Sequence, residues 1–355
     1  MKRAASQNRV LKAPTGSDVA RVAGVSKSAV SRAFNGGLVS EDARARILEA
    51  ARLLKYRPSL TARSLTTNKS GLIGVAITRL DNHFYPEVVE HISERLREEK
   101  YRLVLFITRG ETDLEPVLDE LLGYRLDGIV LASSSLAGQL AAECAQSNVP
   151  VIMFNNIDFE NRAPGVTTDN AAGGSQIARF LLAGDHRRCA VITGVAESST
   201  STERSKAFNE TIMAAGFPPP LVLSGDYSFE GATQATRQLL ASATPPDAIF
   251  CVNDHMALAA VQAAAAAGKT PGRDVSIVGF DNVNIASWPT FSLTTYAQPT
   301  RQMTDDVINR LLKAIDGHPL ANETIRIPGR LIVRDSARRP AGVKSDAHGT
   351  EYWDG

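Results

Sequence analysis

The sequence predicts a small all-α head followed by a larger, two-lobed α/β body with doubly wound parallel sheets. Three observations predict this fold class. Up to residue 70 the chain carries fourteen Lys and Arg against four Asp and Glu, a net charge of +10, which leaves −9 for the rest of its 355 residues. Two short helical patterns in the head meet at a glycine, as in a helix-turn-helix. From residue 71 onward, short runs rich in Val, Ile and Leu alternate with amphipathic stretches.

Composition excludes several classes of protein. A content of 43% hydrophobic and 22% charged residues is ordinary for a globular chain. The apolar runs are too short or too weakly apolar to span a membrane, and the basic N-terminus offers only Val10-Leu11 as an apolar core for a secretion signal. We therefore expect a cytoplasmic protein without a membrane partner. The three cysteines, Cys144, Cys189 and Cys251, lie far apart, which predicts reduced thiols.

The head should contain three capped helices. Thr15 begins the first, with Asp18 at the third helical position as in a capping box, and Gly24 ends it because glycine adopts the left-handed conformation at little cost. Ser26 and Ser40 should cap the second and third helices. The side chains expected to point inward are Val19, Ala20, Ala23, Val25, Ala29, Val30, Ala33, Phe34, Ala43, Ile47, Ala50, Ala51 and Leu54.

The exposed face of the second helix is expected to carry polar and basic side chains. Its side chains are those of Lys27, Ser28, Ser31 and Arg32. Such groups donate to, or accept from, base edges and phosphates in a major groove. Because only the head is basic, a polyanion partner is expected for the head alone. The alternative is a generic three-helix bundle with surface charges.

The body should contain two α/β lobes with a cleft between them. Between its β-type runs lie helical patterns such as Pro86–Lys100 and Gly173–Leu182. The runs are Gly71–Ile77, Tyr101–Ile107, Gly128–Ala132, Pro150–Phe154, Cys189–Thr193, Ala248–Val252 and Val275–Gly279.

Catalytic and metal-binding motifs are missing from the sequence. No nucleophile elbow, phosphate loop, zinc motif or Gly-x-Gly-x-x-Gly follows a first strand, and the six histidines form no short-range ligand pair. We therefore expect no enzyme, no cofactor and no bound metal. A DNA-tethered enzyme would need a catalytic constellation that the sequence does not contain.

Several groups of residues in the head occur in the order of a known family. They are Asp18-Val19-Ala20, Ala23-Gly24-Val25-Ser26, Val30-Ser31-Arg32, Val39-Ser40 and Tyr56-Arg57-Pro58. The head thereby resembles the lac-repressor (LacI/GalR) family, although many relatives carry Thr where Ala29 stands. The resemblance implies a sequence-specific transcriptional repressor, a homodimer on near-palindromic operator DNA. It implies DNA contacts from Thr15, Ser26, Lys27, Ser28, Ser31, Arg32, Asn35, Tyr56, Ala62 and Leu65.

Residues 58–69 resemble the family's hinge helix. They are expected to link a helix-turn-helix domain at 14–57 to the body, and a disordered basic tail at 1–13 is expected to precede that domain. Pro58 suits a helix start, but the segment is too short to stay helical alone in water. It should order only with DNA and the second subunit's hinge. By resemblance, Leu65 wedges into a minor-groove base step and bends the duplex. An ordinary linker leucine is the alternative.

The resemblance extends over the body to about residue 337 and implies an effector-binding and dimerisation domain with the fold of periplasmic sugar-binding proteins. Crossings between the lobes are implied near Thr168, Thr295–Gln298 and Ile325–Leu331. The N-lobe would take about 70–167 and 297–325, the C-lobe about 168–296 and 326–337, and 338–355 a flexible tail. The marks are Asn82-His83-Phe84-Tyr85 (with His83 where the family usually has Pro), Asp127-Gly128-Ile129, Thr168-Asp169-Asn170, Gly184-Asp185-His186-Arg187-Arg188, Asn253-Asp254-His255-Met256-Ala257, Val278-Gly279-Phe280-Asp281-Asn282 and Leu293-Thr294-Thr295.

The resemblance also implies contacts to a small polar effector, a sugar or sugar derivative. Arg204 and Asp281 match the family's effector-contacting arginine and acid. Both follow a β-type run, so both should reach the same edge of a parallel sheet, where they could grip vicinal hydroxyls or, on the arginine side alone, an acidic group. A surface salt bridge between the two is the alternative. The other implied contacts are Asn253, the aromatic Phe84 and Tyr85, Tyr227 stacking from the C-lobe, and the weaker candidates Ser198 and Thr200.

A freestanding sugar-binding protein is the main alternative function. It would need an export signal and no basic head, whereas this sequence has a basic head and no recognisable signal.

Leu65→Ala should reduce both operator affinity and DNA bending, because it removes the apolar wedge from a polar hinge. Energy transfer between labels at the two DNA ends measures the bend. The body should stay folded and bind ligand as before. Equal bending by the variant and the parent would show that Leu65 is an ordinary linker residue.

Overall fold

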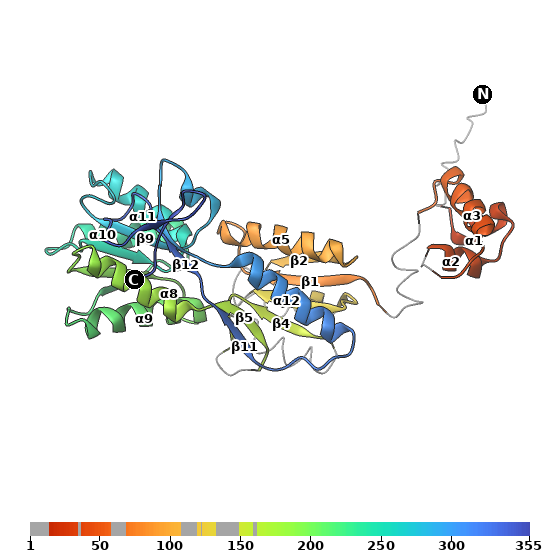
Figure 1. Ribbon diagram of the computed structural model, residues 1–355, viewed down its shortest axis with the longest axis horizontal. Coiled ribbons are helices and arrows are strands. Elements are labelled where there is room, and N and C mark those ends of the chain that lie inside the picture. Colours follow the sequence, from red (N-terminus) through yellow and green to blue (C-terminus); the bar gives the residue numbers. More distant parts are fainter. Residues whose placement is uncertain are drawn as a thin grey trace, which may run out of the picture. The chain divides into compact units, whose positions relative to one another are not determined.

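The computed structural model describes residues 14–34, 37–57, 69–107, 119–121, 123–132, 149–158 and 162–355 (Figure 1). The chain divides into two units, Met1–Gly71 and Leu72–Gly355. The expected basic tail (1–13) and residues 58–68 of the expected hinge helix lie outside the described residues. So do Asn35, Ala62, Leu65 and Cys144.

The smaller unit is a bundle of three helices, α1 (Gly16–Ala23), α2 (Lys27–Phe34) and α3 (Glu41–Leu53). Small alanine side chains let these short helices approach one another closely, and a few larger apolar side chains fill the centre. Its buried core consists of Val19, Ala20, Ala23, Val30, Ala33, Ile47, Ala50 and Ala51. Each of these residues was expected to point inward, so the predicted helical periodicity is confirmed.

The helix ends of this unit follow the sequence closely. Thr15 and Asp18 form the predicted capping box, in which each side chain accepts a hydrogen bond from the other's backbone N–H. Gly24 ends α1 with a φ of 65°, the left-handed conformation that favours glycine. Ser26 and Ser40 each accept a hydrogen bond from the backbone N–H three residues later. Local chemistry therefore sets the limits of these helices.

The larger unit contains two sheets, one per lobe. The N-lobe sheet is parallel throughout, in the order β11-β5-β4-β3-β1-β2. The C-lobe sheet has the order β13-β14-β12-β10-β9-β8-β6-β7, parallel from β10 to β7 and antiparallel at the other end. The strands are β1 (Leu72–Ile77), β2 (Arg102–Ile107), β3 (Gly128–Ala132), β4 (Val151–Phe154), β5 (Gly165–Thr168), β6 (Cys189–Thr193), β7 (Leu221–Ser224), β8 (Ala248–Cys251), β9 (Ser276–Asp281), β10 (Thr294–Ala297), β11 (Thr324–Ile327), β12 (Arg330–Ile332), β13 (Lys344–Ser345) and β14 (Glu351–Trp353).

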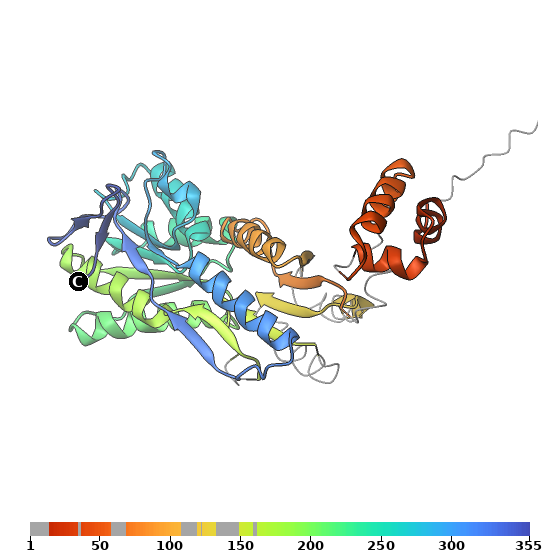
Figure 2. The same ribbon diagram turned by 45° about the vertical axis from the view of Figure 1, so that its right-hand side comes forward.

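Helices cover both sheets. Helices α5 and α12 pack together and against the N-lobe sheet, whereas the pairs α10–α11 and α8–α9 lie on opposite faces of the C-lobe sheet (Figures 1 and 2). Central strands such as β3, β4, β8 and β9 are buried along their whole length, which is why they read as unbroken apolar runs. The helices are α5 (Phe84–Glu98), α8 (Asn170–Ala183), α9 (Ser199–Ala214), α10 (Phe229–Leu240), α11 (Asp254–Ala266), α12 (Thr300–Ile315) and the short 3₁₀ helix η2 (Asn284–Ser287).

Within the described residues, the chain passes between the two lobes three times. It leaves the N-lobe sheet after Thr168, re-enters it past Ala297, and leaves it again after Ile327. The third crossing therefore comes later than the expected boundary at residue 325, because Arg326 and Ile327 still pair with β5. These three crossings are the covalent links about which the lobes can move relative to one another.

The expectation of a flexible tail at residues 338–355 is wrong. Strand β14 pairs antiparallel with β12, and β13 pairs with β14, so the C-terminus extends the C-lobe sheet as a hairpin. Trp353 anchors this hairpin: it is only 6% exposed and packs edge-to-face on Phe180 of α8. Its Nε1–H donates to the Ala341 carbonyl, and its own carbonyl accepts from Gln176. Strands of two and three residues leave too little periodicity for the sequence to reveal.

Trp353→Ala should destabilise the folded protein by about 3 kcal/mol, the lower end for a buried tryptophan, because the hairpin can also detach locally. Denaturant unfolding of the full chain, followed by circular dichroism, measures this. Trp288 is the matched control: it is 53% exposed, and Trp288→Ala should change the stability by less than about 0.5 kcal/mol. Equal, small changes in stability for both variants would support the earlier expectation of a flexible tail at residues 338–355.

Candidate functional site

The exposed face of α2 is basic. Lys27, Ser28, Ser31 and Arg32 are all exposed, as the recognition-helix assignment requires. Among the described residues of the head, Asp18, Asp42 and Glu49 pair with arginines on α1 and α3, and no acid pairs with Lys27 or Arg32. Two cations on one short helix are therefore available to phosphates or base edges.

Three other predicted DNA contacts have local partners. Ser26 Oγ caps α2 and lies 2.9 Å from Ser28 Oγ. Thr15 Oγ1 donates to Asp18 Oδ2 at 2.8 Å. Tyr56 is half-buried and packs edge-to-face on Phe34, with ring centroids 5.9 Å apart. These side chains shape the ends of α1 and α2, and their contact with DNA stays a prediction.

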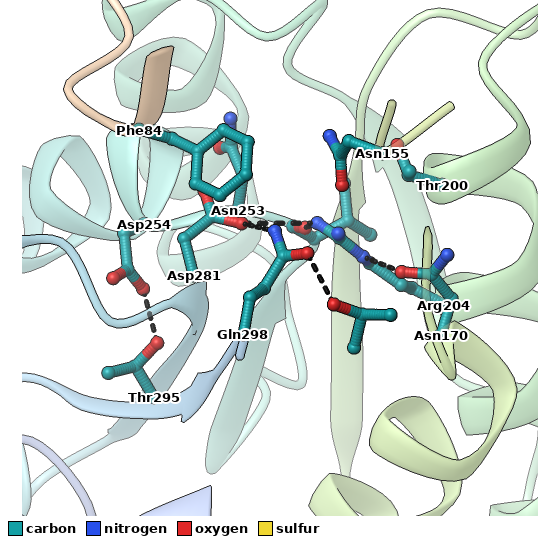
Figure 3. Close-up of polar contacts among 12 residues, drawn as sticks. Phe84, Asn155, Asn170, Thr200, Arg204, Asn253, Asp254, Asp281, Thr295 and Gln298 are labelled. Atoms are coloured by element: carbon teal, nitrogen blue, oxygen red, sulfur yellow. Dashed lines mark hydrogen bonds and ion pairs between the residues drawn. The ribbon is translucent and has the colours of Figure 1, made fainter. Parts of the chain in front are cut away.

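Arg204 and Asp281 meet in the larger unit although they lie far apart in the sequence. Arg204 of α9 is 2% exposed and Asp281 at the end of β9 is 5% exposed; Arg204 Nη1 and Asp281 Oδ1 are 3.5 Å apart (Figure 3). The alternative of a surface salt bridge is therefore wrong. Arg204 also donates to the Val252 carbonyl at 2.7 Å and to Asn170 Oδ1 at 2.8 Å, and its guanidinium carbon lies 3.6 Å from the centroid of the Phe280 ring.

The remaining C-lobe candidates form small hydrogen-bonded groups near this pair. Ser198 caps α9, and the Tyr227 hydroxyl lies 2.8 Å from Ser198 Oγ and 3.0 Å from Thr200 Oγ1. Tyr227 was expected to stack on a ligand, but here its hydroxyl ties the three side chains together. Asn253 caps α11 through Oδ1, which accepts from the Met256 N–H at 3.0 Å.

The two aromatic candidates from the N-lobe are buried at the start of α5. Phe84 stacks on Phe154 of β4, with ring centroids 6.4 Å apart, and lies in the same close-up as Asn253 and Asp281 (Figure 3). The Tyr85 hydroxyl donates to the Ala132 carbonyl at 3.2 Å, and burial raises the pKa of Tyr85. Both lobes therefore contribute candidate residues to one region.

Three buried polar atoms in this region have no hydrogen-bond partner among the described residues: Arg204 Nη2, Asn253 Nδ2 and Asn155 Oδ1. An unsatisfied buried donor or acceptor costs about 1–3 kcal/mol, so proteins rarely keep several together without a reason. Two of these atoms donate and one accepts. They can supply hydrogen bonds to a ligand with both hydroxyl donors and hydroxyl acceptors.

The backbone is strained at three of these positions. Asn155, Tyr227 and Asp281 have φ angles of 67°, 54° and 134°, in the region that disfavours residues with a Cβ. Such conformations cost about 1–3 kcal/mol each and cluster at functional sites. The strain therefore agrees with a binding role for this region.

Two buried carboxyl groups give the region its electrostatic character. Burial raises the pKa of Asp281, and the nearby charge of Asp254 adds to this, while Arg204 acts in the opposite direction. Burial also raises the pKa of Asp254, whose Oδ1 accepts from Thr295 Oγ1 at 2.5 Å. The stability of the ionised form of Asp281 therefore depends on its partners, and Arg204 contributes most.

Sequence reasoning missed three polar residues beside the predicted ones, namely Asn155, Asn170 and Gln298. Each stands just beyond the carboxyl end of a parallel strand, β4, β5 or β10 respectively. The rule that located Asp281 after β9 could have found them, because the carboxyl ends of parallel strands share one edge. Their strands, however, are only four residues long, and β5 and β10 were not among the predicted runs.

The described residues lack two further features. No helix there is long and apolar enough to cross a membrane. Within the same part of the chain, no group of three or more His, Cys, Asp or Glu side chains is placed to hold a metal ion.

Comparisons with known proteins agree with this architecture. Residues 16–59 match the family described as bacterial regulatory proteins, lacI family, and residues 178–337 match a periplasmic binding protein-like domain. The ribose operon repressor of Escherichia coli K12 is 33% identical over 326 residues, which cover 90% of this chain and 98% of the relative. The lac repressor dimer bound to operator and the anti-inducer ONPF superposes with a TM-score of 0.82 at 27% identity, over 92% of this chain and 100% of the other. The complex of the transcriptional regulator CelR with cellobiose has a TM-score of 0.69 at 28% identity, over 91% and 100%.

If Arg32 reads a base edge, Arg32→Ala should weaken specific DNA binding by about 1–3 kcal/mol, and Lys27→Ala should weaken it as well. Gel shifts against the operator and a scrambled duplex measure both affinity and sequence preference. Arg52 on α3 serves as control, since it is also exposed but is paired with Glu49. Unchanged affinity and preference in both α2 variants would remove α2 from the DNA interface.

Proposed function

The chain belongs to the lacI family of bacterial regulatory proteins, and we propose that it is a repressor whose operator affinity is controlled by an uncharged polyhydroxy compound, a sugar or sugar derivative, bound between the two lobes. The head binds double-stranded, near-palindromic operator DNA, and two copies act as a homodimer, as in the lac repressor dimer on its operator. The named relatives are a ribose operon repressor and a cellobiose-bound regulator, which supports a sugar as the effector.

The buried Arg204–Asp281 pair is the observation that carries this proposal. A guanidinium and a carboxylate side by side offer fixed donors and acceptors, and they grip neighbouring hydroxyls of one molecule well. The unsatisfied Arg204 Nη2, Asn253 Nδ2 and Asn155 Oδ1 add two donors and one acceptor nearby. Phe84 supplies an apolar ring for the C–H surface of a sugar.

The charge balance of the pair favours an uncharged ligand. Arg204 is already compensated by Asp281 at 3.5 Å, and both are at least 95% buried. A carboxylate or phosphate on the ligand would draw Arg204 away and leave the Asp281 carboxyl group buried without its partner. Breaking a buried pair in this way costs about 3–5 kcal/mol. A sugar adds hydrogen bonds without separating the charges.

The chain's regions divide this work as follows. We assign residues 14–57 to DNA binding, 58–69 to a hinge helix that contacts DNA through Ala62 and Leu65, and 70–337 to effector binding and dimerisation. The contacts to the effector come from Phe84, Tyr85, Ser198, Thr200, Arg204, Tyr227, Asn253 and Asp281. The body binds its ligand without converting it, and the protein acts in the cytoplasm, where its operator is.

Uncharged sugars should raise the melting temperature of the full chain, because a ligand that binds only the folded state stabilises it. A suitable panel is D-ribose, D-glucose, cellobiose, D-glucuronate, glucose 6-phosphate and adenine. We expect a shift with at least one of the first three and none with the two acidic compounds.

Asp281→Asn should weaken the binding of that sugar about 10–100-fold, since a hydrogen bond to a charged acceptor contributes about 1.5–3 kcal/mol.

Asp226→Asn is the matched control, because Asp226 is an exposed carboxylate of the same lobe and should leave sugar affinity unchanged. Isothermal titration gives both affinities. A shift with glucuronate, glucose 6-phosphate or adenine alone would contradict the proposed ligand class. A sugar that binds but leaves operator affinity unchanged would instead favour a body that binds sugar without regulating the head.

A further inference from the structure

Gln298 connects the candidate site with the crossings. It directly follows β10, at the second crossing, and is 7% exposed. Its Nε2–H donates to Asp281 Oδ1 at 2.7 Å, and its Oε1 accepts from Thr168 Oγ1 at 2.6 Å (Figure 3). Both ends of one amide are therefore used, one on the proposed effector carboxylate and the other on the opposite lobe.

Thr168 places the far end of this contact in the N-lobe. It is the last residue of β5, directly before the first crossing, and it is fully buried. Its Oγ1 also lies 3.3 Å from Met303 Sδ on α12, the helix that follows the second crossing. The Gln298 amide thus joins the first and second crossings to each other.

The Arg204 side of the pair has a similar arrangement. Asn170, at the start of α8 just after the first crossing, accepts from Arg204 Nε through Oδ1. Its Nδ2 donates to Thr167 Oγ1 at 3.1 Å and to Glu203 Oε2 at 3.2 Å. Each member of the ion pair is therefore held by an amide that reaches a threonine of β5. Two independent links of the same kind argue against incidental packing.

We propose that Gln298 is a positioning residue that orients the Asp281 carboxylate and, through Thr168, couples ligand binding to the crossings between the lobes. The inference rests on the proposed effector role of Asp281. A ligand can regulate DNA binding only when it binds two arrangements of the protein with different affinity. Gln298 is hydrogen-bonded to both Asp281 and Thr168. A movement of the lobes at these crossings therefore changes the position of the Asp281 carboxylate, which is the proposed hydrogen-bond acceptor for the ligand.

Three variants separate this role from packing. Thr168→Val removes the hydroxyl that Gln298 accepts from, Thr168→Ser keeps it, and Gln298→Leu removes both contacts. Thr236→Val is the control: Thr236 is fully buried, but its hydroxyl donates to Ala232 within α10. All are made in the full chain, and the probe is the sugar among D-ribose, D-glucose and cellobiose that gives the largest thermal shift.

The first measurement is the coupling factor, the ratio of the sugar's affinities for the DNA-free and the operator-bound protein. Thr168→Val and Gln298→Leu should bring this factor about 3–30-fold closer to one, the range seen when residues along a coupling network are changed. Thr168→Ser and Thr236→Val should stay within about twofold of the parent. A parent-like coupling factor in Thr168→Val overturns the coupling role.

The second measurement needs no ligand. Burial raises the pKa of Asp281, and the charge of Asp254 of α11 raises it further. Arg204 of α9 and the hydrogen bond from Gln298 lower this pKa, because both stabilise the ionised carboxylate. Tyr85 of α5 also faces Asp281. Gln298→Leu should therefore raise the pKa of Asp281, and Thr168→Val should leave it unchanged. NMR titration of the selectively ¹³C-labelled aspartate carboxyl carbons, with Asp281→Asn for assignment, measures this.

The same shift should appear in sugar binding. Since ionised Asp281 is the better acceptor, affinity falls as pH drops through its pKa, and in Gln298→Leu the fall should begin at higher pH. An unchanged pKa in Gln298→Leu overturns the positioning role. A parent protein that binds no sugar of the panel contradicts the proposed function instead, and the titration of Asp281 still decides whether Gln298 positions it.

Discussion

The buried ion pair between Arg204 and Asp281 is the interaction on which the rest of the body depends. Two charges removed from water are tolerated only when their mutual attraction and further hydrogen bonds offset the cost of desolvation. Here the Val252 carbonyl and Asn170 each accept a hydrogen bond from Arg204, while Gln298 donates one to Asp281. These partners come from different strands and from two of the crossings. The C-lobe therefore supplies most of the support for the pair, and Gln298 adds a contact from the second crossing.

Parallel topology explains how such distant residues meet. Four polar residues follow the carboxyl end of a strand in one sheet or the other, namely Asn155, Asn170, Asn253 and Gln298, and Asp281 is itself the last residue of β9. A doubly wound sheet delivers all these ends to one edge, and two such sheets joined by three crossings bring their edges toward each other. The site therefore needs no long loop to assemble it, and helix starts such as those of α9 and α11 supply several of its side chains.

Sequence reasoning succeeded where local chemistry decides the outcome. The capping box at Thr15, the left-handed Gly24 and the buried face of the head follow from the spacing of a few neighbouring residues. Arg204 and Asp281 were found by resemblance and by the strand-end rule. What could not be predicted depends on partners distant in sequence: the two-ended hydrogen bonding of Gln298, the unsatisfied Asn155 Oδ1 and the C-terminal hairpin. Neither a short edge strand nor the hydrogen-bond partners of a buried side chain leave a periodic pattern in the sequence.

Selectivity in such a site arises more from penalties than from attractions. A sugar hydroxyl meets atoms that are already buried and unsatisfied, so its hydrogen bonds recover a cost that the folded protein already carries. An anionic ligand meets the same donors, but it competes with Asp281 for Arg204 and leaves one carboxylate buried without its partner. Under the proposed function, the ion pair would therefore disfavour acidic compounds of similar size, and Gln298 would hold the Asp281 carboxylate in the position that disfavours them.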